Sequence, residues 1–180
     1  GMMLGVELTE ITPPKEWIKT RFPLAENRVA IISPFSNSCS RHTGERPNKT
    51  LDDWKWEHII RYLRRHEYEV QCIGGPGELL HGLSLPISSY RTAYTLEDLQ
   101  RILQSARVVI TVDNGIGHMA SVFDVPTILL WPQVSNIKFI APLWADRTFY
   151  LMLGDPNNAN PAAIIYGIKE ILKKQAEVIG

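Results

Sequence analysis

Short runs rich in β-branched residues alternate with longer amphipathic stretches, and this alternation restricts the fold more than any other feature of the sequence. Strands that alternate with helices build a parallel sheet with helices on both faces. The sequence therefore predicts an α/β chain with a Rossmann-like, three-layer parallel sheet. The predicted strands are Arg28 to Ser33, Tyr68 to Ile73, Val108 to Val112, Pro126 to Trp131 and Thr148 to Leu153.

Three helices are predicted from capping signals at their starts. Thr50 and Asp53 form a T-x-x-D capping box, Thr95 and Asp98 form a second one, and Asn160-Pro161 precedes the last helix. Each start is followed by apolar residues at helical spacing. These residues are Trp56, Ile59, Ile60 and Leu63, then Leu96, Leu99, Ile102 and Leu103, and finally Ile164, Ile168, Ile171 and Leu172.

The charge composition gives the chain no overall field that would attract a polyanion. Lys plus Arg and Asp plus Glu each number 19 among 180 residues, so the formal net charge is zero. Binding to nucleic acid or to an acidic membrane would need a local basic patch. We therefore expect no nucleic-acid partner and at most a peripheral association with membranes.

Neither the cysteines nor the five histidines are spaced as a metal site requires. We expect Cys39 and Cys72 to be free thiols, and we expect no metal. No apolar run is long enough for a signal peptide or a membrane helix. Pro13-Pro14 suits the end of an interdomain linker, so residues 1–27 are predicted to be a lead-in and residues 28–180 one domain.

The segment after Val112 is the best candidate for a ligand site, because ligands of open α/β sheets bind at the carboxyl ends of the strands. A strand runs there into a helix through Asp113-Asn114-Gly115-Ile116-Gly117-His118. Gly115 removes a Cβ where a ligand must approach the backbone. The N–H groups of Ile116, Gly117 and His118 are predicted to face outward as an anion site that suits a phosphate.

The two polar side chains of this turn leave alternatives open. A carboxylate at Asp113 would repel a phosphate unless it caps the helix or accepts hydrogen bonds from sugar hydroxyls, and we expect a cap with sugar contact. His118, in the first turn, could donate a hydrogen bond to a phosphoryl oxygen. Alternatively, Asp113 and Asn114 are only helix caps and His118 packs in the core.

A glycine-rich turn, Gly74-Gly75-Pro76-Gly77-Glu78, follows the second predicted strand. It is no dinucleotide fingerprint, since G-x-G-x-x-G is absent and Pro76 lacks an N–H. It is either a turn that brings the backbone close to a flat ligand or a bare strand-to-helix connection. Glu78 either accepts hydrogen bonds from sugar hydroxyls or is a first-turn acid favoured by the helix dipole.

The long segment after the first strand, residues 34–49, has more basic than acidic side chains. Arg41, His42, Arg46 and Lys49 face only Glu45, which would suit a diphosphate or simply a solvated loop. Further along, Tyr90 and Tyr94 precede the second helix with a capping box. They could border a base or pack at the edge of the core.

In this order, the motifs resemble those of the C-terminal, nucleotide-sugar-binding domain of glycosyltransferase family 9, the ADP-heptose:lipopolysaccharide heptosyltransferases. The resemblance covers about residues 27 to 133 and continues more weakly to the last helix. Its most specific element is the D-x-G-x-x-H turn. The motifs are Asn48-Lys49-Thr50, the pair Trp54 and Trp56, Gly74 to Glu78, Thr95 to Leu99, and Asp113 to His118.

The resemblance implies a role for each matching residue. Lys49 and His118 would be catalytic, because they would stabilise the leaving diphosphate. Ser36 would lie near the same phosphates, and Asp113 would touch the sugar. The implied substrate-binding residues are Ser36, Glu78 at the ribose, Tyr94 at the adenine, Asp113, Asn114, Gly115, Ile116 and Gly117.

The resemblance further implies a single GT-B-type half that binds the donor of an inverting transferase. A nucleotide-sugar such as ADP-heptose would be the substrate, lipopolysaccharide or another glycan the acceptor, and no cofactor is expected. The acceptor and the general base would come from a separate domain or chain, since nothing before Val29 could be that domain. The expected location is cytoplasmic, or peripheral at the inner face of the inner membrane.

Two segments depart from the family pattern at the expected pocket. They are Pro34 to Cys39 and Trp131-Pro132-Gln133, where Phe35 or Trp131 could fill donor space. A non-catalytic nucleotide or nucleotide-sugar binding module is therefore an alternative, and an epimerase-like relative is a third. Fold analogy alone does not separate them.

Overall fold

The computed structural model describes residues 27–36, 51–75, 85–131, 145, 147–155 and 158–179, with side chains to residue 174. The predicted lead-in lies outside these ranges except for its last residue. Lys49, Glu78 and Cys39 also lie outside them, as do Pro132 and Gln133.

Six strands form one sheet in the order β3-β2-β1-β4-β5-β6, and all five neighbouring pairs are parallel. Four of the strands are buried along most of their length, as strands covered on both faces must be. The predicted Rossmann-like sheet is therefore confirmed. The strands are β1 (Val29–Ser33), β2 (Glu69–Gly74), β3 (Ser89–Thr92), β4 (Val108–Val112), β5 (Thr127–Trp131) and β6 (Thr148–Met152).

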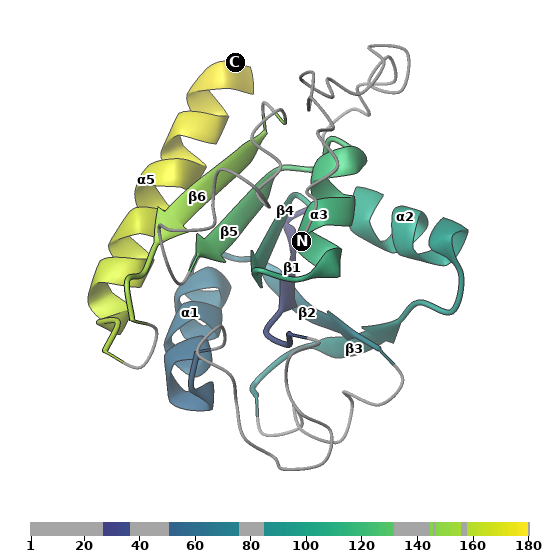
Figure 1. The fold of residues 1–180 in the computed structure, drawn as a ribbon. Coiled ribbons are helices and arrows are strands. Elements are labelled where there is room, and N and C mark those ends of the chain that lie inside the picture. Colours follow the sequence, from purple (N-terminus) through teal and green to yellow (C-terminus); the bar gives the residue numbers. More distant parts are fainter. Residues whose placement is uncertain are drawn as a thin grey trace, which may run out of the picture.

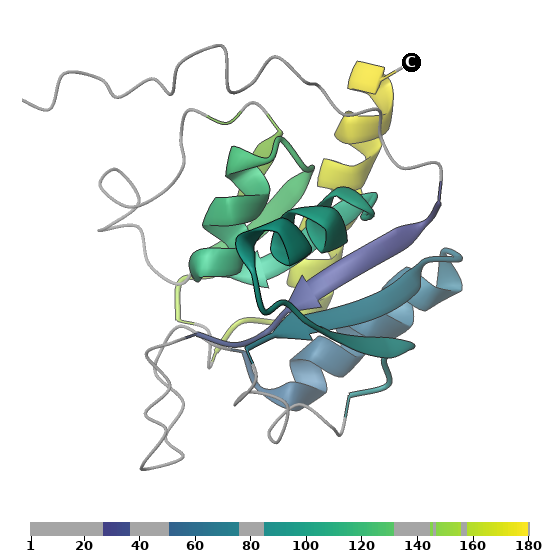
Figure 2. The same cartoon turned by 90° about the vertical axis from the view of Figure 1, so that its right-hand side faces the viewer.

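Helices cover both faces of this sheet, which confirms the three layers (Figures 1 and 2). Helices α1 (Asp53–Arg65) and α5 (Pro161–Ile179) pack against each other on one face. Helices α2 (Leu96–Gln104) and α3 (Gly115–Val122) pack against each other on the opposite face.

Each face has its own apolar core, because successive strand side chains point to opposite sides. Ile32 packs with Trp56 of α1 and Ile164 of α5, whereas the neighbouring Ile31 packs with Leu103 of α2. The predicted apolar faces of α1 and α5 are confirmed by this packing. On α2 the prediction is wrong for Leu96, which is 58% exposed, because it lies at the first residue of the helix and beyond the edge of the core.

Strand β3 is missing from the predicted set. Its sequence, Ser89-Tyr90-Arg91-Thr92, has no apolar run, and its residues are exposed or only half-buried at the edge of the sheet. An edge strand with one neighbour needs no continuous apolar stretch.

The helix starts agree with two of the three predicted caps. Thr95 Oγ1 accepts from the amide of Asp98 at 3.0 Å, and Asn160 Oδ1 accepts from the amide of Ala162 at 2.9 Å. The predicted T-x-x-D box of α1 is wrong, because the N-cap residue is Asp52. Its carboxylate forms no capping hydrogen bond and lies 3.4 Å from Lys55 Nζ.

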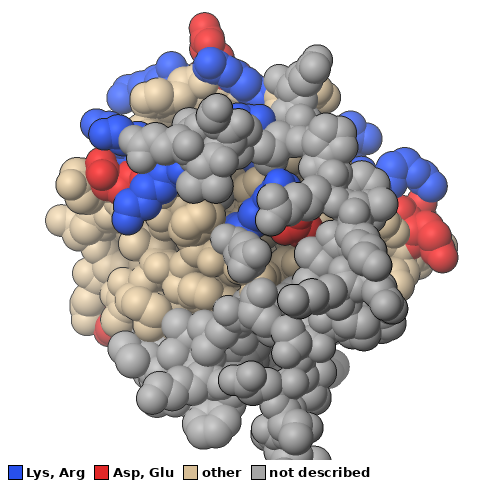
Figure 3. Space-filling model, turned by 90° about the horizontal axis from the view of Figure 1, so that it is seen from above, with Lys and Arg blue, Asp and Glu red and all other residues tan. Residues whose placement is uncertain are grey.

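The amino ends of the strands carry ion pairs between neighbouring connections. Arg28 pairs with Glu67 at 2.8 Å and Arg147 with Asp124 at 3.5 Å. Figure 3 views this end of the sheet from above and shows Lys and Arg side chains beside Asp and Glu side chains. Within the described residues, no helix is both long enough and apolar enough to cross a membrane.

Candidate functional site

The strand order reverses between β1 and β4. From β1 the chain continues to β2 and β3 on one side, and it returns to β4 on the other side of β1. Ligands of doubly wound sheets bind at the carboxyl ends of the two strands that flank such a reversal. The chain after Ser33 and the turn after Val112 lie at this place.

Asn114 is the N-cap residue of α3. Its Oδ1 accepts a hydrogen bond from the amide of Gly117 at 3.0 Å. The expectation that Asp113 caps the helix is wrong, because Asp113 lies one residue before the cap position. The cap is therefore a neutral side chain.

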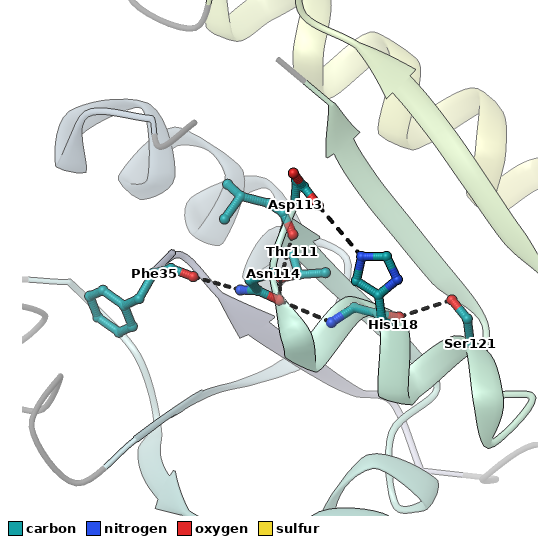
Figure 4. Close-up of polar contacts among 8 residues, drawn as sticks. Phe35, Thr111, Asp113, Asn114, His118 and Ser121 are labelled. Atoms are coloured by element: carbon teal, nitrogen blue, oxygen red, sulfur yellow. Dashed lines mark hydrogen bonds and ion pairs between the residues drawn. The ribbon is translucent and has the colours of Figure 1, made fainter. Parts of the chain in front are cut away.

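The Asn114 side chain also reaches strand β1 (Figure 4). Its Nδ2 donates to the backbone oxygen of Phe35 at 2.6 Å and lies 3.0 Å from Ser33 Oγ. Its Oδ1 also lies 3.0 Å from the hydroxyl of Thr111 on β4. One amide thus connects both strands at the reversal with the start of α3.

Asp113 and His118 form a pair across the first turn of α3, and Figure 4 shows the two side chains pointing toward each other. Asp113 Oδ1 lies 3.5 Å from His118 Nε2. The carboxylate is 8% exposed and the imidazole 33% exposed. The alternative that His118 packs in the core is therefore wrong, because one third of its side chain remains accessible.

The backbone donors of α3 differ from the predicted set. The amide of Gly117 is bonded to Asn114 Oδ1, and the amide of His118 donates to Asn114 O at 3.3 Å. Among the described residues, the amides of Gly115 and Ile116 have no hydrogen-bond acceptor. Of the three predicted amides, only that of Ile116 therefore lacks an acceptor within the described residues, because Asn114 accepts from the other two, and anion binding by Ile116 stays a prediction.

The two glycines of α3 differ in whether their surroundings leave room for a side chain. A Cβ on Gly117 would lie 2.5 Å from Leu129 Cδ2 and 2.8 Å from Thr111 Cγ2, so this glycine lets the helix approach the sheet. A Cβ on Gly115 would meet nothing within 4 Å. Packing explains Gly117 and leaves Gly115 free to face a ligand.

The other predicted site residues are spread along the carboxyl ends of the strands. Ser36 follows β1 and is buried, whereas Tyr94 follows β3 and is 80% exposed. The side chain of Ile116 is partly buried and packs on the core between α2, α3 and the sheet. Lys49 and Glu78 lie outside the described residues.

The two bulky residues expected near the pocket point elsewhere. The Phe35 ring packs against the α1 and α5 core and points away from Asn114 in Figure 4. Trp131 is buried and packs edge-on to Tyr150, with ring centroids 6.1 Å apart. Burial raises the pKa of Tyr150 to about 12.

Sequence reasoning missed the polar groups that support this site. Ser33 and Thr111 are buried polar residues inside strands, where sequence alone gives no sign of a functional contact. Lys55 at the start of α1 is a further buried polar residue that the sequence did not indicate, and its Nζ lies 5.4 Å from the Trp54 ring and 3.4 Å from Asp52. Across the part of the chain that is described, no three His, Cys, Asp or Glu residues lie together as metal ligands would.

The sequence model of glycosyltransferase family 9 (heptosyltransferase) matches residues 34–161 of the chain. No curated protein matches its sequence. A solved structure of E. coli ADP-heptose LPS heptosyltransferase II is 14% identical with a TM-score of 0.67, over 90% of this chain and 51% of its own length.

Two structures of the E. coli heptosyltransferase WaaC have the same fold. The one with ADP is 17% identical with a TM-score of 0.68, over 87% of this chain and 48% of its own. The one with ADP-2-deoxy-2-fluoro heptose is 17% identical with a TM-score of 0.64, over 87% and 47%. The chain therefore spans about half the length of the structures it matches.

Proposed function

Since the chain belongs to glycosyltransferase family 9, we propose that it binds the nucleoside diphosphate sugar donor of an inverting sugar transferase. The binding site would lie at the carboxyl ends of β1 and β4. The observation that carries this proposal is the start of α3, where two unbonded amides, a held imidazole and a glycine open to solvent meet at the strand reversal.

The diphosphate is assigned to the amides of Gly115 and Ile116. A helix N-terminus carries roughly half a positive charge, and unbonded N–H groups there bind phosphate oxygens directly. The first turn of α3 holds no acidic residue that would compete for these donors.

His118 would donate a further hydrogen bond to the diphosphate, and Asp113 would hold its imidazole. A carboxylate next to a diphosphate is unfavourable, but here the imidazole lies 3.5 Å from that carboxylate. A ring N–H of His118 directed at this carboxylate would offset part of the repulsion. The proposed contact of Asp113 with the sugar is a separate prediction that rests on the family resemblance.

In the proposed reaction the acceptor hydroxyl attacks the anomeric carbon, and the bond from that carbon to the diphosphate oxygen breaks. Negative charge then grows on the departing nucleoside diphosphate. Donors fixed around a developing charge stabilise the transition state without reorganisation. His118 and the amides at the start of α3 would supply this stabilisation, together with the predicted Lys49.

An adenine nucleotide is the first ligand to test, because matched heptosyltransferase structures contain ADP or an ADP-heptose analogue. Ser36 near the phosphates, Glu78 at the ribose and Tyr94 at the base remain predictions from the family resemblance. Deprotonation of the acceptor is assigned to the other half of such an enzyme, since the matched structures are about twice as long.

The proposed location is the cytoplasm, with peripheral contact at the inner face of the inner membrane. Support comes from exposed basic residues on two helices that pack side by side, and anionic lipid attracts such residues by about 1 kcal/mol each. Sedimentation with phosphatidylglycerol vesicles, but not phosphatidylcholine vesicles, tests this contact. The residues are Arg61, Arg64 and Arg65 on α1 and Lys169, Lys173 and Lys174 on α5.

A thermal-shift screen against ADP, UDP, GDP, CDP and their sugar conjugates tests the proposed function. A ligand at 100 times its Kd stabilises a fold by about 2.7 kcal/mol, which raises the Tm of a domain of this size by about 5 to 10 °C. We expect this shift with one nucleotide.

Variants test whether the thermal shift depends on the residues of the proposed site. His118→Ala should remove the shift, and Asp113→Asn should reduce it. His58→Ala, an exposed histidine on α1, is the matched control and should keep the shift. A wild-type chain that none of these ligands stabilises would exclude the donor-site assignment, and donor binding without transfer in the presence of the acceptor half would identify a non-catalytic module.

A further inference from the structure

The Asn114 side chain uses most of its hydrogen-bonding capacity inside the protein. A primary amide has two N–H donors and two acceptor positions on its oxygen. Oδ1 lies 3.0 Å from both the Gly117 amide and the Thr111 hydroxyl. Nδ2 lies 2.6 Å from Phe35 O and 3.0 Å from Ser33 Oγ. Both N–H groups and at least one acceptor position of this side chain are therefore engaged within the protein.

Capping alone does not require an asparagine here. Serine and aspartate cap helices about as well as asparagine does. A serine at this position could accept from the Gly117 amide but lacks the second arm that reaches Phe35 O. An aspartate has no N–H to donate and would place an oxygen against the oxygen of Phe35.

The Asn114 side chain bridges the chain leaving β1 and the start of α3, and the proposed donor site contains residues from both segments. Phe35 immediately precedes Ser36 on the chain leaving β1, and Asn114 immediately precedes the unbonded amides of Gly115 and Ile116. Asn114 and Phe35 are 79 positions apart in the sequence. Their bond therefore fixes two distant pieces of chain relative to each other.

We propose that Asn114 is a positioning residue for diphosphate binding, acting by holding the chain after β1 against the N-terminus of α3. This inference rests on the proposed function. The amides of Gly115 and Ile116 bind the diphosphate, and the side chain of Asn114 sets where they lie relative to Ser36. The bridge thus contributes to affinity without touching the ligand.

The test measures the Kd of ADP by calorimetry. A temperature of about 15 °C is chosen so that the variant and the wild type are both folded during the measurement. Asn114→Ser keeps a capping oxygen and adds no charge, but it removes the bridge. We expect ADP to bind about tenfold more weakly and AMP to be affected less, because AMP lacks the second phosphate. A residue that only stabilised the fold would lower the Tm and leave both values of Kd unchanged.

The matched control is Asn160→Ser at the start of α5, where the same residue type caps a helix and, within the described part of the chain, bonds to no strand. It should change the Kd of ADP by less than twofold. Ser33→Ala removes one end of the bridge and should weaken ADP binding by about threefold. Because the two residues would act through one contact, the double variant should bind no more weakly than Asn114→Ser alone.

Three results would overturn the inference. The first is a wild-type Kd for ADP retained within twofold in Asn114→Ser. The second is full additivity of Asn114→Ser and Ser33→Ala. The third is a wild-type chain that binds none of ADP, UDP, GDP and CDP, which would overturn the proposed function with it, whereas the first two leave that function standing.

Discussion

Helices α2 and α3 are capped in the same way, but their first turns differ in charge. Each has a side-chain cap that accepts from the backbone amide three residues later, at 3.0 Å in both cases. The first turn of α2 contains Glu97 and Asp98, whereas that of α3 contains no acid. The cap of α2 bonds only within its own helix end, but Asn114 also bonds to β1.

The difference shows how one local motif can serve two purposes. Acidic side chains in the first turn already balance the positive end of the α2 dipole, so this end has little attraction for an anion. At α3 no acidic side chain in the first turn balances the positive end, which is proposed to bind an anion, and the cap also bonds to Ser33 of the neighbouring strand. The capping signal in the sequence is equally clear at both helices, so it identifies a helix start and not a site.

The largest expected effect comes from giving α3 the acidic first turn of α2. Gly115→Glu should weaken ADP binding by about 100-fold, because a carboxylate about 4 Å from a phosphate costs about 4 kcal/mol at an effective dielectric constant of 20, and rotation of the side chain relieves part of this. Calorimetry with ADP measures the change. The fold should tolerate the variant, since a Cβ there meets no atom within 4 Å.

Gly115→Gln separates the charge from the added volume and should bind ADP better than Gly115→Glu does. Glu97→Gln at the start of α2 should not alter ADP binding. Equal affinities for wild type and Gly115→Glu would mean that the two helix ends do not differ in the proposed way.

The second effect concerns how closely α3 approaches the sheet. Gly117→Ala places a Cβ 2.5 Å from Leu129 Cδ2, and such overpacking costs about 1 to 3 kcal/mol. The Tm should fall by about 2 to 10 °C. Gly115→Ala, two residues earlier on the same helix, should leave the Tm of the unliganded chain nearly unchanged, and a similar fall in both variants would contradict the assigned roles of the two glycines.

A smaller effect is expected at the cap of α2. Thr95→Ala removes the bond to the Asp98 amide, which costs about 1 kcal/mol and lowers the Tm by about 2 to 4 °C. The Kd of ADP, measured below the unfolding transition, should stay the same. Weaker ADP binding in this variant would show that α2 contributes to the site.

The smallest effect is expected at Tyr150, whose buried hydroxyl contrasts with the well-bonded side chain of Asn114. Among the described residues the buried hydroxyl of Tyr150 has no hydrogen-bond partner, so Tyr150→Phe should leave the Tm at pH 7 unchanged or slightly higher. Burial raises the pKa of Tyr150 from 10.0 to about 12.

As pH rises above about 10, the unfolded chain therefore loses this proton before the folded chain does, which favours unfolding. Thermal melts between pH 9 and 12 should show a fall in Tm that is shallower in Tyr150→Phe than in wild type. Parallel curves would argue against the raised pKa of this phenol.

The fold could be predicted in most of its parts because it depends on local patterns. Five of the strands and the starts of α2 and α5 follow from β-branched runs, helical spacing and capping residues. Strand β3 could not be predicted, since its pairing with β2 at the sheet edge needs no apolar run. The start of α1 was placed too early, because Thr50 and Asp52 are both acceptable N-cap residues.

The site was only partly predictable. The turn from Asp113 to His118 was found from its glycines and its place after a strand. The pairing of Asp113 with His118 and the neutral cap at Asn114 depend on helix phase within one or two residues, which sequence patterns do not fix. The bridge to Phe35 depends on β1 and β4 lying side by side, which is a property of the whole sheet.

The pairing of β1 with β4 also bears on when the site can exist during synthesis. Ala30 lies opposite Val108, so the strands that flank the reversal meet only after all of the intervening chain has been made. Contacts between residues this far apart in sequence form slowly, because a long loop must close first. The proposed donor site therefore belongs to the late products of folding, and a partly made chain would display its first helix and second strand well before this site could form.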